Sequence, residues 1–332
     1  MKVSAEKEKY FSCGSEVFWG DPSHPQTCIY RLKGSGVHFH EHIIDSGKGG
    51  EAVEITQITD VHFNICDDMD RADPELAYTE QCRKWLAGGV SKKGIEKAME
   101  FASFTDQTVI TGDTLDYLSH GSLEMMKEYI WDKDENVLCA LGGHELTKQM
   151  QTGRPNETSL EERLEILGGY WKHDMFYVSK IIGDKAMVIV LDNSMQKYTS
   201  SQTEKLKRDI AFAREKGYVA LIFQHEPIST GKEEDTAIEA YKVYDSAVRN
   251  FYDLIGIKGD DETKELYRVI TENADVIRGV YCGHMHSAFY TEIKGSYLSE
   301  KGERIEKTIP QYLLEGNPYD DQCGHVMRIT VK

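Results

Sequence analysis

The chain has 332 residues, and 39 Lys and Arg stand against 56 Asp and Glu, which gives a formal net charge of −17. This acidic balance argues against a nucleic-acid polymer as partner, because proteins that bind the phosphate backbone carry a basic stripe. It would also repel an anionic small molecule at long range unless bound cations concentrated positive potential locally. We find no internal repeat or Pro/Ser-rich linker, and we predict a single domain over residues 1–332.

The cysteines and the N-terminus indicate the cellular compartment in which the protein is expected. Seven cysteines are scattered without a CxxC pair, which favours reduced thiols. The N-terminus lacks the apolar core of a signal peptide, and no run approaches the ~18 apolar residues of a membrane span. We expect a soluble cytoplasmic protein with no membrane partner, although a chain trimmed of its leader would give the same pattern.

The first predicted elements are strands. Residues 1–50 are expected to form a strand extension to the domain. Residues 36–44 and 52–59 both have the character of strands, and the glycine-rich link Ser46 to Gly50 between them predicts a β-hairpin. The second of these strands leads directly to Asp60 and His62.

Strands and helices then alternate, which favours buried strands with helical cover. A C-terminal glycine signal at Gly217 ends one of the helices. In chain order we predict a helical stretch at 75–104, a strand at 108–111, a helix at 121–131, a strand at 137–141, a hairpin of 176–182 with 185–191, a helix at 201–216 and a strand at 218–223.

The stretch 232–273 is expected to be a helical insertion. Between Glu234 and Ile255 apolar residues recur at three- and four-residue spacing, which is typical of an amphipathic helix. This helix either packs on the sheet or overhangs the site as a lid, and packing is favoured because most such stripes lie in a core. The closing strands are predicted at 276–281, 288–293, 308–314 and 325–331.

Five short segments each end an apolar run in acidic or histidine residues. Taken singly, a segment of this kind has a large false-positive risk, and together they are specific by their order. Because each closes a strand-like run, an open α/β sheet can gather them at one edge. The segments are Asp60-Val61-His62, Gly112-Asp113, Gly142-Gly143-His144-Glu145, His225 within Gln224-His225-Glu226-Pro227, and Gly283-His284-Met285-His286.

In this order the segments resemble the signature of the calcineurin-like metallophosphoesterase superfamily, which runs DxH, GD, GNH(D/E), a lone His and GHxH. The resemblance covers residues 60–286, most of the chain. It implies a four-layer α/β/β/α sandwich, in which two mixed β-sheets are flanked by helices and two divalent metal ions lie at one edge. Asp and neutral His without thiolate suit Mn, Fe or Zn in a catalytic site.

The resemblance also implies a role for each matching residue. A water bridging two ions roughly 3.5–4 Å apart would lose a proton near neutral pH, and the resulting hydroxide would attack phosphorus. His144 would lie near the leaving-group oxygen and donate a proton to it. The implied sets are Asp60, His62 and His286 for a first ion, His225 and His284 for a second, Asp113 as the bridge, and His144 and Asp113 as catalytic residues. We also expect His144, Gly143 and Tyr117 to contact substrate.

One position departs from the signature, because Gly143 stands where the family has a metal-binding Asn. Three alternatives remain open. Water fills that coordination position, a nearby side chain such as Glu145 or Asp116 replaces the Asn, or the second ion is held weakly and arrives with substrate. Water is the simplest of these, because catalytic metal sites commonly keep an open position.

The segment Asp116-Tyr117-Leu118 narrows the subfamily. Phosphoprotein phosphatases of the superfamily carry Asp-Arg-Gly there, and Tyr117 cannot supply a bidentate cation. Purple acid phosphatases place a tyrosine iron ligand where Asp116 stands. The leading function is therefore hydrolysis of a small-molecule phosphate ester, by a phosphodiesterase or a small-molecule phosphatase.

Two rival interpretations remain. One is a noncatalytic, metal-retaining relative that binds a phosphorylated ligand, and the other is a scaffold stabilised by metal. His38, His40 and His42 alternate along one predicted strand, where a solvated or edge-strand face is favoured over a further metal patch. The substrate, the metal and the oligomeric state are not given by the sequence.

Overall fold

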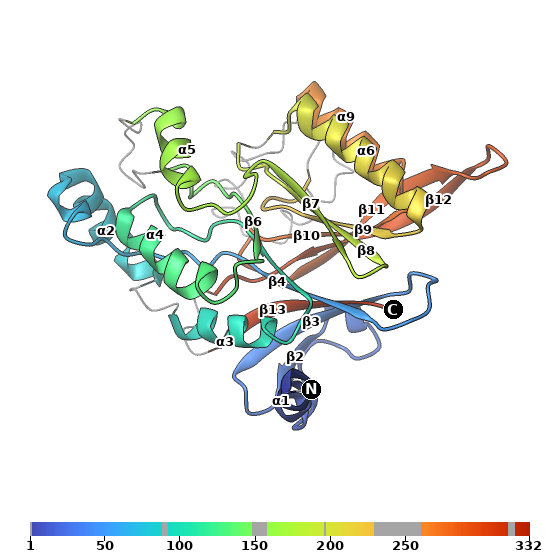
Figure 1. Ribbon diagram of the computed structural model, residues 1–332, viewed down its shortest axis with the longest axis horizontal. Helices are drawn as coiled ribbons and strands as arrows, with labels where there is room; N and C mark the ends of the chain where they lie inside the picture. Colours follow the sequence, from blue (N-terminus) through green and yellow to red (C-terminus); the bar gives the residue numbers. More distant parts are fainter. Residues whose placement is uncertain (1, 88–91, 148–157, 196, 229–259, 318–322) are drawn as a thin grey trace.

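The computed structural model describes residues 2–87, 92–147, 158–195, 197–228, 260–317 and 323–332. Within these residues two mixed β-sheets lie face to face, and helices cover the outer face of each sheet (Figure 1). The predicted four-layer α/β/β/α sandwich is confirmed.

The first sheet has seven strands and the second has six. The first contains, in spatial order, β1 (Ser15–Trp19), β2 (Ile29–Leu32), β3 (Val37–Ile44), β13 (Gly324–Val331), β4 (Val53–Ile58), β5 (Gln107–Thr111) and β6 (Leu138–Ala140). The second contains, in spatial order, β11 (Phe289–Leu298), β12 (Arg304–Leu313), β10 (Ile277–Cys282), β9 (Val219–Phe223), β8 (Ala186–Leu191) and β7 (Tyr177–Ile182).

The helices fall into two groups on opposite sides of the sandwich (Figure 1). Those in the part of the chain that the structure describes are α1 (Lys2–Phe11), α2 (Pro74–Ala87), α3 (Lys92–Ala102), α4 (His120–Met126), α5 (Leu160–Gly168), α6 (Ser200–Lys216) and α9 (Asp261–Thr271). Short 3₁₀ helices lie at Pro25–Thr27 and Asp70–Ala72, and a π-helix lies at Lys127–Trp131. None of these described helices is both long enough and apolar enough to cross a membrane.

Apolar side chains fill three layers. Between the sheets, Ile55 and Val109 of the first sheet pack with Val188 and Phe223 of the second. The other two layers lie under α3 and α4 on one side and under α6 and α9 on the other. Strands buried on both faces are continuous apolar runs, and β8 and β9 accordingly contain no polar residue.

The parallel strands set the position of the site. β4, β5 and β6 run parallel in the first sheet, and β8, β9, β10 and β12 run parallel in the second. Their carboxyl ends therefore lie along one edge of each sheet, where open α/β sheets place ligand sites.

The predicted hairpin of β3 with β4 is wrong. Strand β13 from the C-terminus lies between them, parallel to β3 and antiparallel to β4. A glycine-rich link allows the chain to turn, but it does not require the two strands to pair. β13 is buried over most of its length and takes the central place in the sheet.

The strand extension at the N-terminus begins with a helix that was not predicted. Tyr10 and Phe11 of α1 pack against Phe101 and Phe104, next to the first sheet. The predicted insertion 232–273 lies outside the described residues up to residue 259. Its described part is α9, which packs on α6 and β11 through Leu266 and Ile270.

The prediction of a solvated or edge-strand face for three histidines of β3 is wrong. β3 lies between β2 and β13, inside its sheet. His38 and His40 are buried, and His42 Nδ1 lies 2.8 Å from the Tyr281 hydroxyl in the opposite sheet. His40 Nε2 lies 3.3 Å from a carboxylate oxygen of Glu315.

Candidate metal centre

The five predicted segments follow the carboxyl ends of five strands. Asp60 and His62 come after β4, Asp113 after β5 and His144 after β6 in the first sheet. His225 follows β9, and His284 and His286 follow β10 in the second. Because the two sheets face one another, these loops converge at one edge of the sandwich, and the structure brings the predicted ligand residues together.

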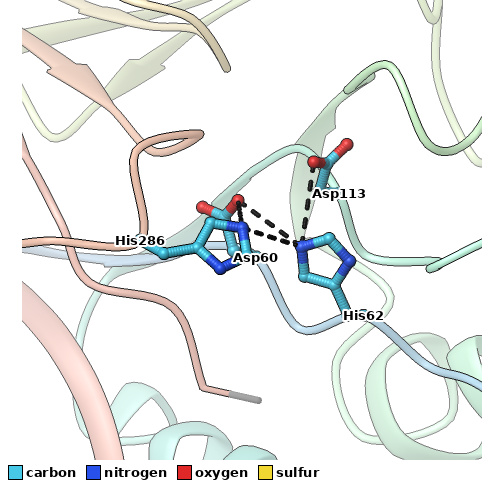
Figure 2. A group of neighbouring side chains, drawn as sticks. All are labelled: Asp60, His62, Asp113 and His286. Carbon is cyan, nitrogen blue, oxygen red and sulfur yellow. Dashed lines mark hydrogen bonds and ion pairs between the residues drawn. The ribbon is translucent and has the colours of Figure 1, made fainter. Parts of the chain in front are cut away.

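The first group consists of Asp60, His62, Asp113 and His286 (Figure 2). The His62 and His286 Nε2 atoms are 3.1 Å apart. An Asp60 Oδ1 atom lies 3.1 Å from His286 Nε2 and 3.7 Å from His62 Nε2. Asp113 Oδ2 completes the group at 3.8 Å from His62 Nε2.

The second group shares that same carboxylate. Asp113 Oδ2 lies 3.1 Å from His225 Nε2, and His284 Nδ1 lies 3.2 Å from His225 Nε2. The other ring nitrogen of His225 lies 2.8 Å from the Thr111 carbonyl oxygen, which turns Nε2 toward Asp113. Asp113 therefore stands between a group from β4 and β10 and a group from β9 and β10.

The donor spacing fits metal coordination. Ligands bonded to one ion at about 2.0–2.2 Å stand roughly 3.0–3.6 Å apart in tetrahedral or octahedral geometry. The donor–donor distances given above run from 3.1 to 3.8 Å, and all donor atoms of each group lie within 4.8 Å of one another. Imidazole and carboxylate donors without thiolate suit Mn, Fe or Zn, so each group has the chemistry and the spacing to hold one divalent ion.

The backbone is strained at the ligand positions. Asp60, His62, Asp113, His284 and His286 have φ of 47°, 49°, 48°, 70° and 48°, and no other non-glycine residue in the described ranges has positive φ. A left-handed conformation costs an ordinary residue about 1–2 kcal/mol. Strain of this kind is characteristic of functional sites, and here it coincides with the donor residues.

Two glycines allow the loops to approach one another. A Cβ atom at Gly142 would lie 2.1 Å from Asp113 Oδ1, and one at Gly283 would lie 2.3 Å from Asp60 Oδ2. Both contacts are far inside van der Waals range, so these positions require glycine. The glycines that precede the histidines in the two motifs therefore make room for the carboxylates.

Neither a protein-family model nor a curated protein sequence matches this chain. Similar solved structures include a dimetal phosphatase from Danio rerio, at 11% identity and a TM-score of 0.43 over 80% of this chain and 90% of that chain. A purple acid phosphatase from yellow lupin is 10% identical with a TM-score of 0.48, and the match covers 92% of this chain but 59% of that one.

The calcineurin-like phosphoesterase YfkN from Bacillus subtilis is also similar, at 13% identity and a TM-score of 0.31 over 80% of this chain and 82% of that chain. All three are distant likenesses.

The electrostatics of the site combine buried carboxylates with buried imidazoles. Burial opposes ionisation of Asp60 and Asp113, but neighbouring histidines outweigh it and hold the pKa of both carboxyls below the usual range. Burial lowers the pKa of His62, but Asp116 and Asp60 outweigh it and raise it to about 10. Burial and the adjacent His225 lower the pKa of His284 to about 3. A metal binding here would displace protons.

His144 lies at the margin of the two groups and is partly exposed. Its Nε2 is 3.8 Å from Asp113 Oδ2, and its Nδ1 is 2.7 Å from the backbone oxygen of Asp116. Because a carbonyl oxygen only accepts, Nδ1 carries the proton in the neutral ring and Nε2 faces the centre.

Gly143 has space around it. A Cβ atom there would meet only the Ser194 carbonyl oxygen, at 3.9 Å. Neither side chain considered as a replacement ligand is available. Glu145 accepts hydrogen bonds from the backbone of Asp113, Leu115 and neighbouring residues, and Asp116 is bound by a guanidinium group. The alternative that Glu145 or Asp116 replaces the Asn is thus not supported.

Tyr117 does not face the centre. Its side chain is fully buried with Cys66 and Leu76, and its hydroxyl donates to Asn64 Oδ1 at 3.2 Å. The predicted contact of Tyr117 with substrate does not suit this placement, because a buried side chain whose hydroxyl is already bonded presents nothing to a ligand.

Several supporting residues were missed in the sequence. Arg83 and Asn64 bind Asp116, and the backbone N–H of the fully buried Asn317 donates to the Asp60 carbonyl at 3.2 Å. Glu226 is buried beside His225, and burial raises the pKa of its carboxyl to about 8. Only Glu226 lay inside a recognised segment, so only Glu226 carried a signal that could have been followed.

Proposed function

We propose that this chain is a metal-dependent phosphoric ester hydrolase that acts on a small-molecule phosphomonoester or phosphodiester. The observation that carries the proposal is the position of Asp113. Its Oδ2 lies within 3.8 Å of His62, His144 and His225. One carboxylate thus faces both donor groups and the partly exposed histidine.

In this proposal Asp60, His62 and His286 would hold a first divalent ion, His225 and His284 would hold a second, and Asp113, which belongs to both groups, would serve each of them. The ions are Mn, Fe or Zn, whose identity the donor set leaves open. When bound, two such ions acidify water and neutralise the charge that develops on the phosphoryl group.

The protein residues supply orientation and a proton. Thr111 and Asp116 hold the Nδ1 atoms of His225 and His62, so that both rings present Nε2. His144 presents Nε2 in the same direction. We assign the proton transfer to its imidazolium form, which carries a proton on both nitrogens, gives the Nε2 proton to the leaving-group oxygen and keeps the Nδ1 proton on the Asp116 carbonyl. General acids of this kind usually contribute about 10²–10⁴ in rate.

At Gly143 we propose that water completes the coordination of the second ion. The free space next to this glycine supports the proposal, as does the engagement of Glu145 and Asp116 in other hydrogen bonds. We further propose a cytoplasmic location, which is supported by the seven cysteines, since all lie in described residues and none forms a disulfide.

The test is turnover of bis-p-nitrophenyl phosphate and p-nitrophenyl phosphate by Mn²⁺-loaded protein. We expect hydrolysis of at least one ester, with loss on chelation and recovery when Mn²⁺ is restored. The rival function is a noncatalytic relative that binds a phosphorylated ligand, which is favoured by the missing amide at position 143. Metal-loaded protein that binds phosphate but hydrolyses neither ester would establish that rival.

A further inference from the structure

The carboxylate of Asp116 is the centre of a buried network behind the proposed metal ligands. Asp116 is fully buried. Its Oδ1 lies 3.0 Å from His62 Nδ1 and 3.2 Å from His144 Nδ1. His144 has a second partner in the Asp116 backbone oxygen, whereas within the described part of the chain His62 Nδ1 is bonded to this carboxylate alone. The orientation of His62 therefore depends on where the Asp116 carboxylate is held.

Arg83 holds that carboxylate from helix α2. Its Nε donates to Asp116 Oδ2 at 2.8 Å, and its Nη2 donates to Asp116 Oδ1. The two parallel bonds fix the plane of the carboxylate, which a single point donor such as lysine does not. Arg83 is itself 6% exposed, so its guanidinium is turned into the protein and away from any substrate.

Asn64 ties the same assembly to the first motif. Its Nδ2 donates to the backbone oxygen of Arg83 at 3.0 Å and to Asp116 Oδ2 at 2.5 Å. Asn64 lies two residues after His62, so the strand end that carries His62 and the helix that carries Arg83 meet on one carboxylate.

The Arg83 guanidinium also argues against a third metal site around Asp116. His62, Asp116 and His144 lie close enough together to hold an ion of their own. A cation there would lie against the fixed positive charge of Arg83, with both Asp116 oxygens already accepting from it. The carboxylate is therefore committed to hydrogen bonds, and its role is to orient the histidines.

We propose that Arg83 is a positioning residue for the first metal ion, which acts by clamping Asp116 so that Asp116 holds His62 with Nε2 toward Asp60 and His286. The proposal rests on the proposed metal centre and adds to it a residue from helix α2. Partners that orient a ligating histidine typically change metal affinity about 10–100-fold when removed. We expect the effect at the first ion alone, because His62, which Asp116 orients, belongs to the first group and not to the second.

The experiment measures Mn²⁺ affinity in protein that retains one group at a time. His225→Ala removes a ligand of the second group and leaves the first, whereas His62→Ala does the reverse. Arg83→Gln is added to each, and free Mn²⁺ is followed by electron paramagnetic resonance during titration. We expect about 10–100-fold weaker binding in the His225→Ala background and a change of less than about twofold in the His62→Ala background.

Arg214→Gln is the matched control, because Arg214, a residue of α6, makes the same two-bond contact with Asp275. It should leave Mn²⁺ affinity unchanged in both backgrounds. Arg83→Lys keeps the charge but not the fork, and it should fall between wild type and Arg83→Gln. If Arg83→Gln does not fold, Arg83→Lys is compared with wild type in the same two backgrounds.

Unchanged affinity of the first group in a folded Arg83 variant would overturn the proposal, as would equal weakening of both groups. A different result would contradict the proposed function: protein that binds two ions but hydrolyses neither ester. Protein that binds no Mn²⁺ in any background would overturn the proposed centre and this inference together.

Discussion

His62 and His286 face one another across the centre, with their Nε2 atoms 3.1 Å apart, although 224 residues separate them in the sequence. One follows a strand of the first sheet and the other follows a strand of the second (Figure 2). A contact between these two rings requires the two sheets to be packed together. Metal bound there would therefore join the two halves of the sandwich, and it should stabilise the folded chain as well as serve the reaction.

Replacement of Gly143 by Asn should tighten the second ion. The position has room, since a Cβ atom would meet only the Ser194 oxygen at 3.9 Å, and the amide oxygen would add a ligand. We expect Mn²⁺ to bind the second group more tightly in Gly143→Asn, as measured by titration of the His62→Ala protein. Gly142→Ala is the contrasting control, because its Cβ would strike Asp113 Oδ1, and it should weaken both sites. Identical metal binding in Gly143→Asn and wild type would count against an open position there.

Because the backbone is strained at the ligand positions, glycine should be more stabilising than alanine there, which is the reverse of the usual order in a helix. At φ of 48°, His286 has a backbone conformation that alanine tolerates poorly and glycine tolerates well. In the metal-free protein we expect His286→Gly to unfold with a free energy about 1 kcal/mol higher than His286→Ala. Ala211→Gly in the exposed middle of α6 should instead lose about 1 kcal/mol. Urea denaturation of the four proteins measures both differences, and a His286→Gly protein less stable than His286→Ala would show that the site is not strained.

Removal of His144 should affect the chemistry more than the metals. We expect His144→Gln to lower kcat by about 10²–10⁴ for phenyl phosphate, a poor leaving group, and by much less for p-nitrophenyl phosphate. The reason is that an acidic leaving group departs without a proton donor. Steady-state kinetics on the two esters measure the difference, and bound metal per chain should stay at the wild-type value. Equal losses on both esters would remove His144 from the proton transfer.

His42 predicts a loss of stability in acid. Burial lowers its pKa from 6.5 to about 4, so below pH 6.5 the unfolded chain takes up a proton that the folded chain does not accept until about pH 4. The stability that the neutral His42 side chain contributes is therefore fully present above pH 6.5, and it is lost as the pH drops toward 4. Over that range wild type should lose at most about 3 kcal/mol more than His42→Gln. Chemical denaturation across this pH range tests the prediction, with exposed His24→Gln as a control that should behave as wild type. Parallel pH curves for wild type and His42→Gln would contradict it.

The order of the five segments predicted residues that converge in space. The sandwich itself was predicted from the resemblance of these segments to the calcineurin-like metallophosphoesterase signature, and the apolar runs before them located the strands. Local pattern did not predict which strands pair. β13 lies between β3 and β4. Long-range packing, and not the glycine-rich link between β3 and β4, determines which strands are neighbours in this sheet.

The supporting residues of the site were not visible in the sequence for a similar reason. Arg83 is one of many polar residues in its helix, and the helix sequence gives no sign that this residue has a special role. Its partner Asp116 is 33 positions away in the sequence, so no local pattern connects the two. Tyr117 illustrates the opposite error. It lies beside the second motif, but the chain turns its side chain into a buried cluster with Cys66 and Leu76.

The central claim is that two ions held around Asp113 hydrolyse a phosphate ester. The most direct test is turnover of bis-p-nitrophenyl phosphate and p-nitrophenyl phosphate, measured against the number of Mn²⁺ ions bound per chain as chelated protein is reloaded. We expect hydrolysis of at least one ester to appear as the second equivalent binds, and we expect Asp113→Asn to abolish this hydrolysis. Two ions bound with turnover of both esters still at background, or turnover that persists in metal-free protein, would contradict the proposed function.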